Sequence, residues 1–394
     1  MTRVLHGAVL LSVGWLSMVS IAARAQPNLA ELKSEYESVT AELQKHLVHE
    51  FWIDDAPESP ELLARQWTLE GAWVAAWLNA HPSAGSDGVR QALHQLDAAD
   101  ESTALELSEG TFLVAARTGI GCVFIVAKLD GQYHLAWSTA QPQEARGEQA
   151  EILAAWRPEN ARAGGRGPYW MAYGSAGPVM PILGLLPTDA KGRARFYIDG
   201  IYAQGAGMVV GAQISLWAWD GKTARPQIAR HYTVMIDAAV GTRLEGNLLK
   251  VREKTFFRTF STYGPSEERK TDWIVRLTPQ GIEDLGETSL NPELDVVDEL
   301  FYRVIHHQEA SDVASPAEAK HVNEIVNEAR KGDKNWKEYP SLGIMEDWSV
   351  HDNANSKILC LEIDPAGVNI LTLKSMGGKL FISDMKPTDK PCMK

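Results

Sequence analysis

The longest uninterrupted β-strand pattern in the chain runs from Arg195 to Asp237, and it limits what the chain can fold into more than any other stretch. From Ala212 to Trp219 small or aliphatic residues alternate with a glutamine, a serine and two tryptophans, so the two faces of a strand differ. Asp220-Gly221 tolerates positive φ, so we expect the chain to turn there and return as a second strand. Both faces have side chains to bury, and such a sheet needs neighbours on both sides.

The first 25 residues have the pattern of a secretory signal peptide. Arg3 precedes an apolar run over 9–21, and Ala23-Arg24-Ala25 forms an Ala-x-Ala cleavage site. This run is short and interrupted for a membrane span, and no other segment approaches about 20 apolar residues. An uncleaved anchor is the alternative. We expect export to the periplasm of a Gram-negative bacterium, or secretion, and no membrane span in the mature chain.

The formal net charge of −13 becomes −15 without this leader, because the leader carries two arginines and no acidic residue. An acidic protein repels phosphate backbones and anionic lipid, so we expect no nucleic-acid partner. The charges are spread along the chain rather than gathered in blocks, which favours solubility. The length of 394 residues exceeds that of a single typical core and predicts two or three domains.

Three cysteines remain to be assigned in an oxidising compartment. Cys360 and Cys392 share the C-terminal segment and would close a short loop, so we expect them to form a disulfide. Cys122 lies in the apolar run CVFIVA and is interpreted as a buried core thiol. A catalytic role for Cys122 is disfavoured, because no basic partner is identifiable and apolar burial raises the pKa of a thiol.

The period of the apolar residues divides the rest of the chain. Helical spacing covers residues 26–100, strand spacing covers 104–288, and residues 291–394 carry two helix patterns and then three short strands. Short strands joined by turns, without alternating helices, argue against a parallel sheet. We expect an α+β fold that is mainly β: a helical N-terminal region, a central antiparallel β domain, then two helices and a C-terminal β-meander.

Two Asp-Gly turns suggest how the central sheets are arranged. Asp130-Gly131 and Asp220-Gly221 lie 90 residues apart, and each joins an apolar strand to a return strand. This spacing equals two units of about 45 residues, the length of a propeller blade. We therefore expect part of a propeller or a sandwich. The glycine- and proline-rich residues 156–187 between the turns are interpreted as a loop or irregular strand.

Motifs with a known mechanism are missing from the sequence. There is no G-x-S-x-G, no S-x-x-K, and no phosphate-binding loop around Gly221-Lys222-Thr223. His306 and His307 point about 100° apart on a helix, which disfavours one shared metal even with His321 nearby. The segment 352–355 lacks the spacing of a calcium loop. We expect no metal site and no cofactor, and the sequence leans against an enzyme without deciding the question.

Aromatic residues provide the candidates for ligand binding, namely Trp217, Trp219, Gln213, Trp170 and Tyr173. The first three share one strand face, and the last two lie in a glycine-rich segment. Aromatic faces beside hydrogen-bonding side chains suit a sugar ring or an aromatic-rich protein surface. The alternative is that the two strand tryptophans pack between sheets.

Three functions remain open. The first is an exported, envelope-associated protein that binds another protein or a cell-wall glycan without catalysis. The second is a periplasmic hydrolase of glycan or peptide that uses carboxylates such as Asp199, Asp220 or Asp237. The third is a carrier of a small ligand, which would need the central sheet to close around a dry apolar cavity.

Overall fold

The structure is a computed structural model that describes a set of separate segments of the chain. These are residues 28–46, 60–96, 102–116, 122–139, 181–204, 209–235, 241–255, 257–262, 269–332, 342–353, 356–364 and 366–392. The expected leader lies outside this part of the chain.

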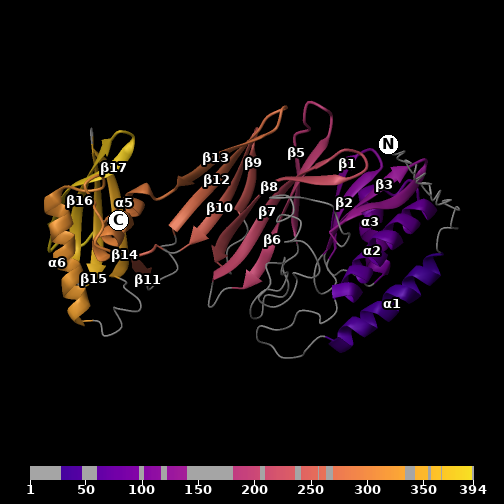
Figure 1. The fold of residues 1–394 in the computed structure, drawn as a ribbon, viewed down its shortest axis with the longest axis horizontal. Coiled ribbons are helices and arrows are strands. Elements are labelled where there is room, and N and C mark those ends of the chain that lie inside the picture. The colour runs from indigo at the N-terminus through magenta and orange to yellow at the C-terminus, as the bar shows by residue number, and fades with distance from the viewer. Residues whose placement is uncertain are drawn as a thin grey trace, which may run out of the picture.

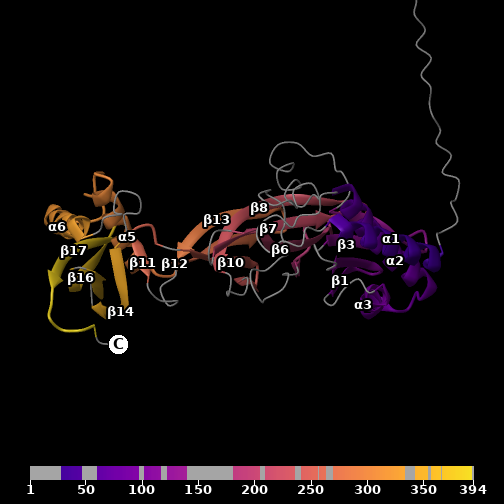
Figure 2. The same ribbon diagram turned by 90° about the horizontal axis from the view of Figure 1, so that it is seen from below.

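In the described segments, five helices and four sheets are arranged along the long axis of an elongated molecule (Figures 1 and 2). Sheet 1 contains β1 (Ser102–Ser108), β2 (Thr111–Ala116), β3 (Cys122–Leu129) and β4 (Gln132–Ser138). Sheet 2 contains β5 (Ile182–Leu186), β6 (Ala194–Gln204), β7 (Val209–Trp219) and β8 (Ala224–Met235). Sheet 3 contains β9 (Gly241–Glu245), β10 (Leu248–Thr255), β12 (Arg269–Leu277) and β13 (Ile282–Ser289).

Sheet 4 completes the fold near the C-terminus. It contains β11 (Phe260–Thr262), β14 (Leu342–Asn353), β15 (Ser356–Asp364), β16 (Gly367–Met376) and β17 (Lys379–Pro387). All named strand pairs are antiparallel except β11 with β14. The expected α+β fold that is mainly β is confirmed.

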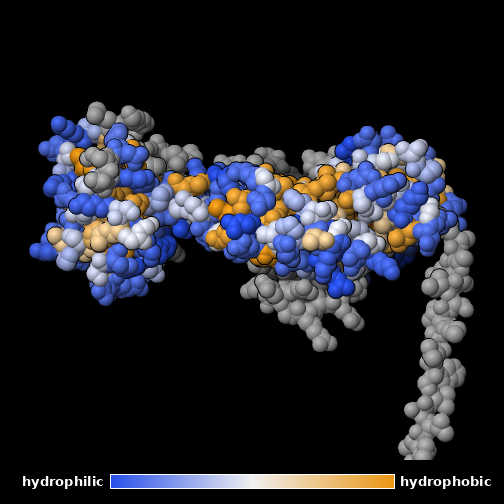
Figure 3. Space-filling model, turned by 90° about the horizontal axis from the view of Figure 1, so that it is seen from above, coloured by the Kyte–Doolittle hydropathy of each residue, from blue (hydrophilic) through white to orange (hydrophobic). Residues whose placement is uncertain are grey.

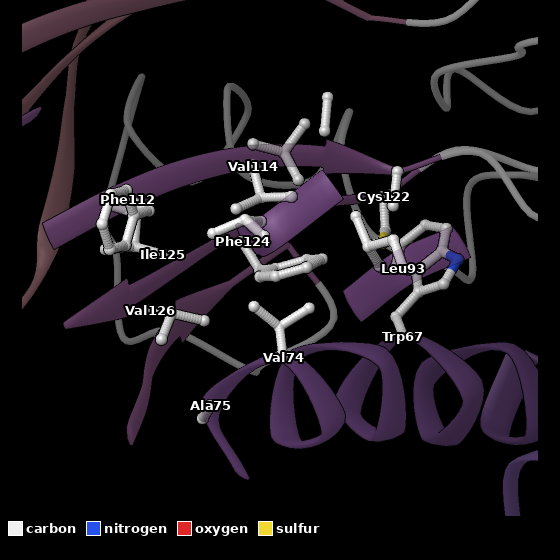
Figure 4. Packing of buried hydrophobic residues seen from close by; sticks show 14 of the residues in the cluster. Trp67, Val74, Ala75, Leu93, Phe112, Val114, Cys122, Phe124, Ile125 and Val126 are labelled. Atoms are coloured by element: carbon white, nitrogen blue, oxygen red, sulfur yellow. The ribbon is translucent and has the colours of Figure 1, made fainter. Parts of the chain in front are cut away.

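The N-terminal helices are α1 (Leu29–His46), α2 (Pro60–Ala80) and α3 (Gly85–Gln95). Helices α2 and α3 pack against sheet 1, and α1 packs against α2. Figure 4 shows Trp67 and Val74 of α2 facing Phe124 and Val126 of β3, and all four side chains are buried. The helices and sheet 1 thus share one hydrophobic core. Residues on both sides of the boundary expected near residue 100 contribute to this core.

Sheet 2 is buried on both faces, as the alternation in β7 predicts. Trp217 and Phe196 belong to the core that contains sheet 1, whereas Ile214 and Leu216 belong to a second core with sheet 3. Sheets 1, 2 and 3 are therefore three antiparallel meanders stacked face to face. In the described chain they do not close into a barrel.

The two Asp-Gly turns occupy equivalent positions in successive meanders. Asp130-Gly131 joins the third and fourth strands of sheet 1, and Asp220-Gly221 joins those of sheet 2. Asp130 has φ 50° and the two glycines have φ 85° and 96°, the conformation for which such turns select these residues. The 90-residue spacing is therefore the separation in sequence between equivalent turns of two successive sheets, and it does not correspond to two propeller blades.

The C-terminal unit consists of sheet 4 with helices α5 (Pro292–Ile305) and α6 (Pro316–Gly332), which share a core with β15, β16 and β17. The chain leaves sheet 3 after β10, forms β11 beside β14, and then returns to sheet 3 as β12. With the final step from β13 to α5, it passes between sheet 3 and the C-terminal unit three times. Residues 260–262 therefore belong to sheet 4, although the sequence pattern assigned them to the central domain.

Candidate functional site

The tryptophans of β7 are packed between sheets. Trp217 and Trp219 are 0% and 3% exposed. The ring of Trp217 lies edge-on to Trp137 of β4, with centroids 5.1 Å apart, and stacks near Phe196 of β6. Its Nε1 donates to Ser215 Oγ at 2.8 Å. This environment favours the packing interpretation, because the ring is surrounded by sheets 1 and 2.

The remaining candidates for ligand binding divide in two. Trp170 and Tyr173 lie outside the described residues. Gln213 is 1% exposed, and neither its Nε2 nor its Oε1 has a hydrogen-bond partner in the described part of the protein. Trp137 Nε1 is also buried without a partner there. The interface of sheets 1 and 2 thus holds polar groups that its own described residues leave unpaired.

Asp199 lies between sheets 2 and 3 and is 0% exposed. Its Oδ1 accepts a hydrogen bond from the Tyr232 hydroxyl at 2.5 Å, and its Oδ2 accepts one from Thr242 Oγ1. Burial raises the pKa of Asp199 to about 7, against the opposing effect of hydrogen bonds from Thr242, Tyr232 and the Gly200 N–H. This carboxyl is enclosed by the two sheets.

Asp220 has a structural role in the turn after β7. Its Oδ1 accepts hydrogen bonds from the backbone N–H of Lys222 at 3.0 Å and of Thr223 at 2.9 Å. Burial opposes ionisation, but these bonds outweigh it and lower the pKa of Asp220.

These carboxylates do not form a catalytic pair. Asp199 is opposite Ile214, which is six residues before Asp220, so about 20 Å of strand separates the two positions. A glycosidase pair needs about 5 to 10 Å. The third candidate, Asp237, lies outside the described residues.

Cys122 is a buried thiol beside a buried carboxyl. Its Sγ donates to Glu70 Oε2 at 2.9 Å, and the Tyr36 hydroxyl donates to Glu70 Oε1 at 3.5 Å. Burial raises the pKa of the Cys122 thiol well above its usual range, and the charge of Glu70 adds to this effect. The thiolate is therefore suppressed, which fits a core residue. Glu70 of α2 is buried beside it, which no pattern in the sequence indicates.

The other two cysteines are paired, and His306 and His307 lie just after the last residue of helix α5. Cys360 and Cys392, the pair favoured by the sequence, form a disulfide with Cα atoms 5.6 Å apart. The ring of His306 lies 4.4 Å from that of Tyr302, and His307, two residues beyond the end of α5, has φ 57°. In the described segments, no group of three or more His, Cys, Asp or Glu side chains is placed to hold a metal ion.

None of the described helices combines the length and the apolar character needed to cross a membrane.

Strand β5 is a candidate binding surface that the sequence did not reveal. It forms one edge of sheet 2, and its five residues, ILGLL, include no charge. Ile182 and Leu185 are 37% and 44% exposed, even though β1 approaches this strand. Gly184 lies under the ring of Tyr197, where a Cβ atom would come 2.1 Å from Cε1. The glycine therefore keeps β5 close to β6.

Several other edge strands carry the charges that normally prevent pairing with another chain, whereas β4, which helix α2 contacts, and the three-residue β11 carry none. Edge strand β13 contains three acidic residues, β9 contains Arg243 and Glu245, and β17 contains two lysines and an aspartate. On the face drawn in Figure 3, apolar atoms gather over the middle of the molecule, where sheets 2 and 3 lie. An uncharged edge with two exposed aliphatic side chains is suited to pairing with an extended peptide.

No protein-family model matches this chain, and no curated protein matches it in sequence.

Proposed function

We propose that the protein is an exported, non-catalytic binding protein that accepts an extended segment of another protein beside β5. The observation that carries this proposal is the uncharged β5 edge with its exposed Ile182 and Leu185. A strand added there would form main-chain hydrogen bonds with the side of β5 that faces away from β6. Because successive side chains point to opposite faces, Ile182 and Leu185 would contact it from both sides of the sheet.

The environments of the polar candidates support binding rather than catalysis. Asp199 is enclosed between sheets, and Asp220 is used by its own turn. Trp217 and Trp219 are surrounded by packing partners, which favours a protein over a cell-wall glycan as the ligand. A carrier would need a closed sheet, whereas the described meanders stay open.

Export is part of the proposal. It rests on the Ala-x-Ala pattern at Ala23-Arg24-Ala25 and is supported by the disulfide between Cys360 and Cys392, a bond that persists in oxidising compartments. The mature protein is then expected to begin at Gln26.

Photocrosslinking in bacterial cells that export the protein tests the proposal. With a photoreactive amino acid at position 182, we expect a defined adduct with another protein in the periplasmic fraction. Leu185→Lys in the same chain should reduce that adduct several-fold, because a charge on an edge strand opposes strand addition. The change itself should cost less than about 0.5 kcal/mol of stability, since Leu185 is 44% exposed.

Position 285 provides the matched control. Leu285 is 40% exposed on β13, an edge strand with acidic residues. We expect its photoreactive variant to give little adduct, and any adduct there should not respond to Leu185→Lys. An absent adduct at position 182, or one that Leu185→Lys leaves unchanged, would contradict the proposal.

A further inference from the structure

Asp199 connects three strands that belong to two different sheets. It lies on β6 of sheet 2, and its partners are Tyr232 on β8 of the same sheet and Thr242 on β9 of sheet 3. The contact with Thr242 crosses the interface beside apolar side chains such as Leu249 and Val251, and Arg230 of β8 also crosses it to Glu253 and Glu287 of sheet 3. Among the described residues, Asp199 is thus a polar link between sheets 2 and 3.

The charged and titratable groups around this carboxyl do not compensate a negative charge. Tyr197 lies on strand β6 with Asp199. Burial and the charge of Asp199 raise the pKa of Tyr232, and the charge of Glu253 on β10 adds to this effect. Arg230 of β8 is engaged by Glu253 at 3.3 Å and by Glu287. In the described chain no lysine or arginine forms an ion pair with Asp199. An ionised carboxyl would therefore rely on two hydroxyl groups and one backbone N–H.

The protonated carboxyl suits this position better. A carboxylic acid donates one hydrogen bond and still accepts others, and a hydroxyl group both donates and accepts. Thr242 or Tyr232 can therefore remain bonded to Asp199 after protonation by rotating its hydroxyl hydrogen. Protonation removes the cost of a buried charge without losing the link between the sheets.

We propose that Asp199 is a proton-controlled contact between sheets 2 and 3, which holds the sheets together when the carboxyl is protonated and loosens them when it ionises.

The direction of the pH dependence follows from proton binding. In the closed interface the pKa of Asp199 is raised to about 7, whereas an open interface exposes the carboxyl to water, where its pKa is about 4. Between these values the closed state binds more protons than the open state, so closure weakens as pH rises. Above about pH 7 both states are ionised and the dependence ends. The stability of the contact between sheets 2 and 3 thus depends on pH between about pH 4 and pH 7.

Amide hydrogen exchange of the full exported protein tests this inference. Protection of β9 and β10, corrected for intrinsic exchange rates, should fall by about 10- to 100-fold between pH 5 and pH 8. Asp199→Asn keeps the shape but cannot ionise, so its protection should be almost independent of pH. Asp272→Asn is the control, because Asp272 is a buried carboxyl of β12 paired with Arg243 and Arg252. This control should keep the wild-type pH dependence.

Tyr232→Phe provides a second test that does not depend on the Asp199 variant folding. It removes a donor to Asp199, so the loss of protection should shift to higher pH than in the wild type. The inference is overturned if wild-type protection is flat from pH 5 to pH 8, if Asp199→Asn keeps the wild-type dependence, or if Tyr232→Phe leaves the transition in place.

Discussion

Replacing Trp217 by alanine is expected to destabilise the protein by about 3–5 kcal/mol, as for other large aromatic residues in well-packed cores. Trp217 is 0% exposed, lies against Trp137 and Phe196, and donates a hydrogen bond to Ser215. Alanine would leave a cavity between sheets 1 and 2, and the Ser215 hydroxyl would keep only its hydrogen bond to the Ile198 carbonyl. Chemical unfolding of the purified variant measures this loss as a lower free energy of unfolding.

Leu244→Ala is the comparison for that experiment. Leu244 is 41% exposed on edge strand β9, so its truncation should cost less than about 1 kcal/mol. A Trp217→Ala protein of normal stability that had lost binding to a saccharide would contradict the packing role. It would support the sugar-binding role for this strand face.

Replacing Asp298 by alanine is expected to cost about 2–5 kcal/mol and to loosen the 257–262 segment from helix α5 of the C-terminal unit. Asp298 lies on α5 and is 2% exposed. Its Oδ1 accepts hydrogen bonds from the backbone N–H of Thr259 at 2.9 Å and from Thr259 Oγ1 at 2.7 Å. Its Oδ2 accepts one from Arg258 Nε at 3.1 Å. The substitution would leave buried donors of the 257–262 segment unpaired.

Scanning calorimetry should show the effect of Asp298→Ala as a lower unfolding temperature of the C-terminal unit. The control is Asp295→Ala, one turn earlier on α5. Asp295 pairs with Arg269 at 2.8 Å, but both side chains are partly exposed, so its loss should cost at most about 1 kcal/mol. Equal effects of the two substitutions would show that the buried contacts of Asp298 add nothing.

Much of the fold follows from local patterns. The apolar stripes of α1 and α2 predict helices that the structure places near the expected residues. The Asp-Gly turns predict the hairpins of β3 with β4 and of β7 with β8. The proximity of Cys360 and Cys392 in sequence predicts their pairing. Each of these signals depends on residues close together in the chain.

Other elements lack such a signal. Strand β5 is five residues long and follows a glycine- and proline-rich stretch, so its sequence resembles a loop. Strand β1 has no clear alternation, and β9 is short and polar. Strand β11 pairs with β14 across about 80 residues of sequence, and no local pattern indicates which sheet receives it.

The candidate sites, like these strands, depend on contacts between residues that are far apart in the sequence. The alternation in β7 correctly places Trp217 and Gln213 on one face, but only the stacking of sheet 1 decides that this face is buried. Asp199 lies in a strand pattern like any other, and its enclosure depends on Thr242 arriving from sheet 3. The exposure of Ile182 depends on which strand forms the edge of sheet 2.

Hydrogen exchange at β5 in the complex tests the central claim most directly. The partner captured at position 182 is purified and added to the unmodified protein, and exchange of the β5 backbone amides is compared with and without it. If the partner adds a strand, amides of Ile182–Leu186 that lack a partner in sheet 2 become protected, while those of β13 do not change. Unchanged exchange at β5, with protection elsewhere on the molecule, would contradict binding by strand addition.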